Sequence, residues 1–208
     1  MDGPLRFLED LGLHVTVLAG TDEHRLADVN DALRDPDLKA IIATRGGKGA
    51  YRIADQLDFA AAARHPKLLV GFSEITILHL ALWMRCRLPG IHGAPFEESW
   101  AGPQSARSFL SAVFTTDAVT VRRHPDEPTG VLTTTGSVSG VLLGGNQDVL
   151  AIASGWTLPS LAGAILLLEG HNIRAVRIAL TTSPLTSASV WRSACSRRPG
   201  SQLNTSRP

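Results

Sequence analysis

The amino-acid sequence predicts an α/β fold with a parallel sheet. Short apolar runs alternate with stretches whose apolar residues recur at helical spacing, which is the pattern of strands separated by covering helices. The clearest unit starts at Leu68-Leu69-Val70, an apolar run typical of a buried parallel strand, and continues as a helix from about Ile75. In sheets of this kind the functional groups lie on loops at the carboxyl ends of the strands.

The same alternation predicts the remaining elements in chain order. Helices are expected at residues 3–11, from 21 to about 34, from about 51, at 105–114 and at 149–153. Strands are expected at residues 14–18, at 39–44 as a buried strand, and at 68–70, 139–145 and 164–169, while residues 90–93 are expected to be a strand end or a turn.

Changes in this pattern divide the chain into four parts. Residues 1–95 are expected to form an N-terminal α/β domain, residues 96–134 a linker, and residues 135–180 part of a smaller, β-rich C-terminal domain. Residues 181–208 are dominated by Ser, Thr, Arg and Pro without apolar periodicity, so they are expected to be a disordered or unrelated tail.

Composition narrows the class of protein. The chain has 208 residues, a formal net charge of +1 and 44% hydrophobic residues, which is enough apolar content to bury a core. A near-neutral charge argues against a dedicated nucleic-acid binder, and no apolar run reaches the roughly 18 residues that a membrane span needs. The two cysteines, Cys86 and Cys195, suit a reducing compartment, and the N-terminus has no signal-peptide pattern. We therefore expect a cytoplasmic protein without nucleic-acid or membrane partners.

The turn after Val70 has the order of a nucleophile elbow. Gly71-Phe72-Ser73-Glu74 places a serine between a strand and a helix, where a sharp turn exposes the hydroxyl beside the unpaired N–H groups of the helix N-terminus. The order is G-F-S-E rather than G-x-S-x-G, and serine is also favoured as a helix N-cap because of its hydrogen bonding. Local sequence therefore leaves two roles open for Ser73, catalytic nucleophile and helix cap.

A glycine-rich turn, Arg45-Gly46-Gly47-Lys48-Gly49-Ala50, follows the strand expected at residues 39–44. Glycines let the backbone approach a ligand closely and point N–H groups at an anion. The spacing fits neither a P-loop nor a dinucleotide-binding fingerprint, so nucleotide binding is a distant alternative and an ordinary turn stays open.

Other polar residues also stand at expected strand ends. Arg45 and His92 follow two of the strands in the first half of the chain, as Ser73 does. Glu169 directly follows the apolar run 166–168, which makes it a candidate catalytic acid. Because the carboxyl ends of parallel strands share one edge, these residues are candidates for a common site.

Taken together, these stretches resemble the LD-carboxypeptidase family of serine peptidases, which includes muramoyltetrapeptide carboxypeptidase and the microcin-immunity proteins. The order and spacing of the motifs match the family from about residue 3 to residue 179. The motifs that carry the resemblance are Ala19-Gly20-Thr21-Asp22-Glu23, Arg25 with Ala27-Asp28, Thr44-Arg45-Gly46-Gly47-Lys48-Gly49, Gly71-Phe72-Ser73-Glu74-Ile75-Thr76, His92-Gly93, Gly144-Gly145-Asn146 and Leu167-Leu168-Glu169.

The resemblance implies a fold and a set of catalytic roles. The N-terminal domain would be like a class I glutamine amidotransferase or flavodoxin layer, followed by a smaller β-rich domain. Within a Ser-His-Glu triad, Ser73 would be the nucleophile and Glu169 the acid that orients the histidine. The backbone N–H of Glu74 and one from Gly46 or Gly47 would form the oxyanion hole.

The resemblance also implies substrates and partners. Family members remove the terminal D-alanine from murein tetrapeptide in the cytoplasm, as part of peptidoglycan recycling, or cleave related amides such as those of peptide-nucleotides. Arg45, His92 and Asn146 are candidate substrate-binding residues, and no metal or organic cofactor is expected. An exposed sheet edge would favour pairing, so a homodimer is one expected assembly.

Several positions depart from the family pattern. Lys48 stands where an aromatic residue is usual, and Glu74 where Asp is usual. The family's first strand and the C-terminal portion that carries the catalytic histidine have no counterpart here, so the sequence predicts a chain truncated at both ends. The alternative function is therefore a catalytically inactive relative that lacks the triad histidine.

Three histidines of the chain are candidate substitutes for the triad base. His171 lies only two residues from Glu169, whereas the acid and its histidine normally come from separate segments. His79 is expected to pack within the helix after Ser73, and His92 is expected either to line the cleft or to belong to a turn. Without a base, serine is a poor nucleophile at neutral pH.

Overall fold

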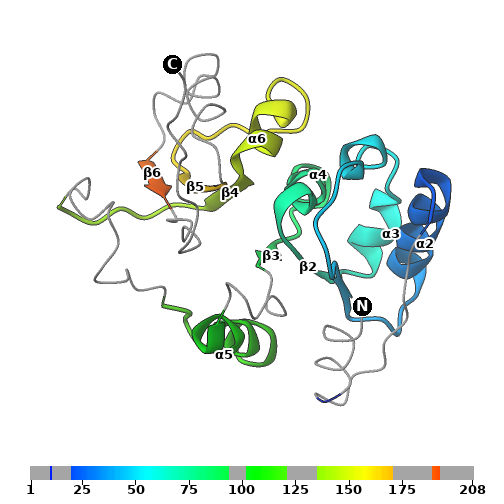
Figure 1. The fold of residues 1–208 in the computed structure, drawn as a ribbon, viewed down its shortest axis with the longest axis horizontal. Helices are drawn as coiled ribbons and strands as arrows, with labels where there is room; N and C mark the ends of the chain where they lie inside the picture. Colours follow the sequence, from blue (N-terminus) through cyan, green and yellow to red (C-terminus); the bar gives the residue numbers. More distant parts are fainter. Residues whose placement is uncertain (1–9, 11–19, 94–101, 121–134, 171–188, 193–208) are drawn as a thin grey trace, which may run out of the picture.

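The computed structural model describes residues 10, 20–93, 102–120, 135–170 and 189–192 (Figure 1). The strand expected at residues 14–18 and, apart from residue 10, the helix expected at 3–11 lie outside these ranges. The helices are α2 (Asp22–Arg34), α3 (Phe59–Arg64), α4 (Thr76–Cys86), α5 (Gly102–Phe114) and α6 (Gln147–Ala153), with single 3-10 turns η1 (Ala50–Arg52) and η2 (Ser73–Ile75). The strands are β1 (Ala40–Ile42), β2 (Leu68–Gly71), β3 (Gly90–His92), β4 (Leu142–Asn146), β5 (Ile165–Glu169) and β6 (Ser189–Arg192).

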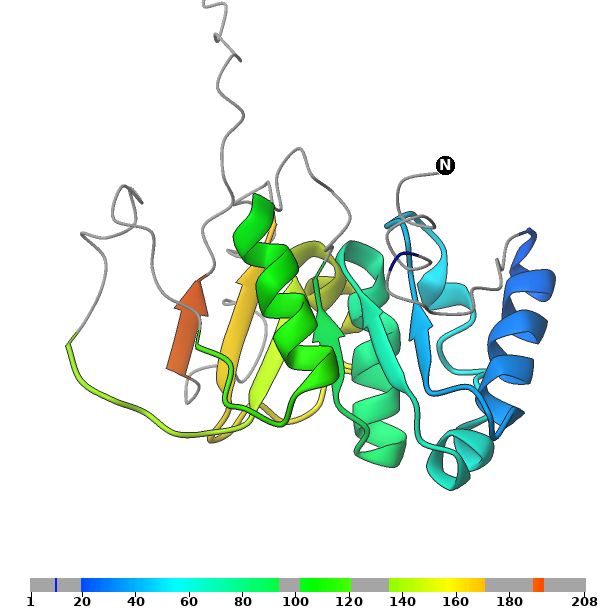
Figure 2. The same cartoon turned by 90° about the horizontal axis from the view of Figure 1, so that it is seen from below.

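The strands form two three-stranded parallel sheets, in the orders β1-β2-β3 and β4-β5-β6. Figure 2 shows the strands side by side with their arrows pointing the same way. The last residues of neighbouring strands are paired, Gly71 with His92 in one sheet and Asn146 with Glu169 in the other. The expected α/β class with parallel pairing is therefore confirmed, and the carboxyl ends of the strands share one edge.

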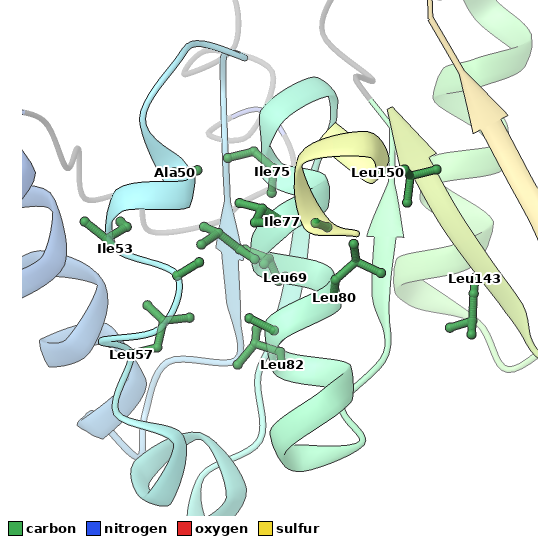
Figure 3. Packing of buried hydrophobic residues seen from close by; sticks show 14 of the residues in the cluster. Ala50, Ile53, Leu57, Leu69, Ile75, Ile77, Leu80, Leu82, Leu143 and Leu150 are labelled. Carbon is green, nitrogen blue, oxygen red and sulfur yellow. The ribbon is translucent and has the colours of Figure 1, made fainter. Parts of the chain in front are cut away.

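Helix α4 lies at the centre of the hydrophobic core. Its inward residues, among them Ile77 and Leu80, are buried against Leu69 of the first sheet and against Leu143 and Leu150 from the second sheet and α6 (Figure 3). Figure 1 shows α4 and α6 together on one side of the strands and α5 on the other. One core thus joins both sheets, and the burial of each large aliphatic side chain stabilises this arrangement by about 2 kcal/mol.

Local sequence signals explain where several helices begin and end. Thr21 caps α2 by accepting the His24 N–H at 3.4 Å, and Asp58 caps α3 by accepting the Ala61 N–H at 2.9 Å. Asp22 and Glu23 stand in the first turn of α2, where carboxylates stabilise the positive end of the helix dipole. Helix α4 ends at Cys86, and the C-cap residue Arg87 adopts a left-handed φ of 58°.

Three elements differ from the sequence-based expectation. Strand β1 is three residues long and only half buried, because it is the outer strand of its sheet among the described residues. The helix expected from Tyr51 is a single 3-10 turn. Ile53 and Ala54, which follow it, are buried in the core, and the chain then turns towards the Asp58 cap of α3. The regular helix of this stretch is α3, which begins only at Phe59, after its Asp58 cap.

The second half of the chain is an alternating βαβ segment between residues 142 and 169. The expected helix at 105–114 is confirmed as α5 and begins three residues earlier. Within residues 181–208, where no regular structure is expected, Ser189–Arg192 forms β6 and pairs in parallel with β5. The tail composition hid this strand, because four residues are too few to show a periodicity.

His79 is a half-buried polar residue at the interface of α4 and the first sheet. Its Nε2 lies 3.2 Å from the carbonyl oxygen of Leu69, and a side chain at Gly90 would overlap the imidazole ring. Its ring centroid is 6.2 Å from that of His92. Burial, together with the neighbouring His92, lowers the pKa of His79 to about 4.

The pKa of His79 predicts that stability falls in acid. The unfolded chain binds a proton at His79 below its ordinary pKa of 6.5, whereas the folded chain does so only near pH 4. The free energy of unfolding should therefore be highest above pH 6.5 and fall, by on the order of 3 kcal/mol, as the pH drops from 6.5 to 4. Urea unfolding at several pH values measures this slope. His79→Gln, which keeps a donor for Leu69 and cannot be protonated, should flatten it, and an equal slope in this variant would contradict the assignment.

Candidate functional site

Ser73 sits in a strained turn between β2 and α4. Its φ is 56°, in the left-handed region that non-glycine residues rarely occupy, while Phe72 before it is extended. The chain then passes through η2 directly into α4. This is the strand-turn-helix geometry that holds a nucleophile clear of the sheet.

The Ser73 hydroxyl does not cap the helix that follows. The residues at the cap positions of η2 and α4 are Phe72 and Ile75, and neither helix start has a side-chain capping bond. The alternative in which Ser73 serves only as a helix N-cap therefore has no support in the hydrogen bonding. The strained φ of Ser73, together with a hydroxyl that caps neither helix, favours a chemical role for this residue.

The glycine turn after β1 packs directly against this elbow. A Cβ atom at Gly46 would lie 2.9 Å from the Ser73 Cβ and 3.1 Å from its Oγ, and one at Gly47 would lie 2.6 Å from the Glu74 Oε1. The Glu74 Oε2 also accepts the Ala50 N–H at 2.9 Å. The structure thus brings Gly46, Gly47, Ser73 and Glu74 together, and only glycine allows so close an approach.

An ion triad holds the far end of the same turn. The Asp22 carboxylate accepts hydrogen bonds from the guanidinium groups of Arg25 and Arg52, and a Cβ at Gly49 would lie within 3 Å of both groups. The hydrogen bond from Arg52, and then that from Arg25, lowers the pKa of Asp22. Arg45 and Lys48, by contrast, point into solvent from the turn.

The candidate acid lies at the end of β5 beside an imidazole. The Glu169 Oε2 is 3.5 Å from the His92 Nε2 and 3.2 Å from the Asn146 Nδ2. Both side chains are largely enclosed, with exposed side-chain fractions of 15% for His92 and 26% for Glu169. A carboxylate next to an imidazole in such a setting can fix the orientation of the ring.

Asn146 connects this acid to two other elements. Its Oδ1 accepts the N–H groups of Asp148 and Val149 at 3.2 and 3.3 Å, which caps α6. Its backbone N–H donates to the Thr76 Oγ1 at 2.9 Å. The sequence predicts Asn146 as a candidate substrate contact but gives Thr76 no role beyond its place in the elbow motif, three residues after Ser73.

The site residues therefore form two groups along one edge. The elbow and glycine turn make the first group, and His92, Asn146 and Glu169 make the second, with Thr76 between them. Within the described ranges, no group of three or more His, Cys, Asp or Glu side chains is arranged to hold a metal ion. No helix in the part of the chain that the structure describes is long and apolar enough to cross a membrane.

Comparison with known proteins identifies relatives of this chain. Residues 4–93 match the LD-carboxypeptidase N-terminal domain. A Bacillus subtilis protein named probable murein peptide carboxypeptidase is 41% identical over 103 residues, which is 45% of this chain and 32% of the relative. The murein tetrapeptide carboxypeptidase of Pseudomonas aeruginosa is 36% identical over 172 residues, which is 76% of this chain and 55% of the relative. The chain thus spans about half, or less, of the length of these relatives.

Solved structures show the same fold. The MccF-like protein of Bacillus anthracis matches with a TM-score of 0.74 at 22% identity, covering 90% of this chain and 70% of that one. The muramoyltetrapeptide carboxypeptidase of Oxalobacter formigenes matches with a TM-score of 0.69 at 24% identity, covering 93% and 73%. Through its N-terminal domain, and with this fold, the chain belongs to the LD-carboxypeptidase family.

Proposed function

We propose that this chain carries the nucleophile and the orienting acid of a serine-type LD-carboxypeptidase. The observation that carries the proposal is the strained backbone of Ser73, whose hydroxyl caps no helix and against which the glycine turn packs. A hydroxyl held clear of the sheet beside backbone N–H groups is what acyl transfer requires. The family relatives that bear murein peptide names support a peptide substrate.

In this proposal Ser73 attacks the carbonyl carbon of the bond before a terminal D-amino acid of murein tetrapeptide. The hydroxyl proton passes to a histidine base, the carbonyl electron pair moves onto oxygen, and the tetrahedral intermediate collapses to an acyl-enzyme as the amine leaves with the proton. Water then hydrolyses the ester by the same steps and frees Ser73. The acid Glu169 orients the histidine and stabilises its charged form.

The oxyanion would be bound by backbone N–H groups at the junction of the two loops. The N–H of Glu74 and one from Gly46 or Gly47 are the proposed donors, since these residues lie against Ser73. Arg45, exposed beside Gly46, is suited to pair with the terminal carboxylate of the substrate. His92 and Asn146 stay candidate substrate contacts on the other side of the site, and the proposed chemistry uses no metal or organic cofactor.

Neither the sequence nor the geometry assigns one particular histidine as the base of this mechanism. His92 is the imidazole beside Glu169, and His171 is the one histidine after that acid in the sequence. Because no histidine is assigned as the base, the second candidate function is that of a relative that binds peptide without cleaving it. Both candidates take a small peptide or a related peptide-nucleotide amide, and we place both in the cytoplasm, with the hydrolase acting in peptidoglycan recycling.

A covalent probe separates these two functions. A fluorophosphonate should add the mass of one probe molecule to the folded protein, and Ser73→Ala should abolish this adduct. Ser154→Ala, a control variant at a serine away from the site, should keep it. With murein tetrapeptide, D-alanine release should fall at least about a thousandfold in Ser73→Ala. A folded protein that shows neither adduct nor release would exclude the hydrolase for this chain and leave the binding function.

The tether between Glu74 and the glycine turn generates a second prediction. Glu74→Ala removes the acceptor of the Ala50 N–H, so the turn should loosen, the Ala50 amide should exchange faster with deuterium, and stability should fall by about 1–2 kcal/mol. Glu74→Gln keeps an oxygen at this place and should retain most of the protection. Hydrogen exchange of the Ala50 amide measures the first effect, and urea unfolding measures the second. Equal loss in the two variants would show that charge, rather than this hydrogen bond, holds the turn.

A further inference from the structure

A buried hydroxyl links the nucleophile elbow to the acid half of the site. Thr76 is the first residue of α4, three residues after Ser73, and its side chain is fully buried. Its Oγ1 accepts the backbone N–H of Asn146 at 2.9 Å. This hydrogen bond crosses from the helix of the first sheet to the end of β4 in the second sheet.

The approach of the two segments is built into the backbone of β4. Gly145 has a φ of +137°, which side-chain-bearing residues rarely adopt. A Cβ there would lie 2.5 Å from the Thr76 Oγ1 and 3.1 Å from the His92 Nδ1. Any other residue at this position would push β4 away from both groups, so glycine is required for Thr76 to reach Asn146.

The bond fixes a residue whose side chain holds Glu169. The Asn146 amide oxygen is used by two N–H groups at the start of α6, which sets the orientation of the amide, and its Nδ2 then donates to the Glu169 Oε2 at 3.2 Å. Asn146 and Glu169 are also paired in the sheet. Moving the Asn146 backbone would therefore move the carboxylate with it.

We propose that Thr76 is a positioning residue that sets Glu169 at its distance from Ser73 by way of Asn146. Ser73 begins the 3-10 turn that leads directly into α4 at Thr76. The hydrogen bond from Asn146 to Thr76 therefore fixes the position of Glu169 relative to the elbow. The catalytic part of this inference rests on the proposed hydrolase function. The structural part, the dependence of Glu169 on the Thr76 hydroxyl, stands without it.

The inference also separates two roles for Asn146. One amide N–H of its side chain is bound to Glu169 and its oxygen is bound to α6, which leaves one amide hydrogen for a substrate. Asn146 acts chiefly by holding the acid. Its exchange for a residue that cannot do so should disturb Glu169 even in the absence of any substrate.

The test compares Thr76→Val with Thr76→Ser, because valine keeps the shape and loses the acceptor while serine keeps the acceptor. In Thr76→Val, the Asn146 backbone amide should exchange with deuterium at least about tenfold faster relative to its neighbours, since a partly buried N–H loses its partner. By NMR, the side-chain amide signal of Asn146 in Thr76→Val should shift in the same direction as it does in Glu169→Gln. The carboxylate signal of Glu169 should also move from its wild-type position. Thr76→Ser should keep the wild-type signals.

Two results would overturn the proposal. One is a Thr76→Val protein whose Asn146 and Glu169 signals stay at wild-type positions, and the other is a Thr76→Ser protein disturbed as much as Thr76→Val. If Thr76→Val does not fold, Thr76→Ala leaves space for water and is judged by the same signals. These readouts do not need turnover, so they fail independently of the proposed function.

Turnover, where the wild-type chain shows it, gives the catalytic readout. D-alanine release by Thr76→Val should lose about ten- to a hundredfold in kcat with KM within about twofold, because a misplaced acid slows the chemical step and leaves the substrate contacts in place. Thr76→Ser should restore the rate. A change in KM alone would show that Thr76 shapes substrate binding instead and would refute the positioning role.

Discussion

The packing of helix α4 against both sheets is the constraint on which the rest of this structure depends. Its buried aliphatic face contacts side chains from β2, β4 and α6, so one hydrophobic core holds the two sheets together. Because Ser73 directly precedes this helix, the packing that stabilises the fold also fixes the direction of the elbow. The stability of the core and the geometry of the site thus have one physical origin.

Close backbone approach is the second requirement of the site. At Gly46, Gly47 and Gly145 the position of a missing Cβ is occupied by Ser73, Glu74 and Thr76. Polar groups can then bridge loops that come from distant parts of the chain, as Glu74 does to Ala50 and Thr76 does to Asn146. Each bridge uses a group that would otherwise be buried without a partner, which makes these contacts costly to lose.

Charge is distributed unevenly over the site edge. The glycine turn is held by the Asp22 carboxylate between two guanidinium groups and has Arg45 exposed at its start. The acid half instead has the enclosed Glu169 carboxylate next to the Asn146 amide and the His92 imidazole. A substrate whose terminal carboxylate lies near the turn and whose scissile carbonyl lies at Ser73 would match this distribution, which is consistent with the proposed peptide hydrolysis.

The sequence by itself determined the alternation of strands and helices and the placing of Ser73, His92 and Glu169 at strand ends. Periodicity and turn residues are local properties, so the α/β class and parallel pairing could be predicted from them. Motif order was enough to assign the family.

Only the tertiary structure decided which strand ends meet and what each polar group contacts. The half-buried β1, the shortening of the expected helix at Tyr51 and the strand β6 depend on neighbours far away in sequence. The same holds for Thr76, whose hydroxyl has a role only because β4 comes within hydrogen-bond distance of α4. Local propensity cannot encode such contacts, because burial and partner choice are properties of the packed chain.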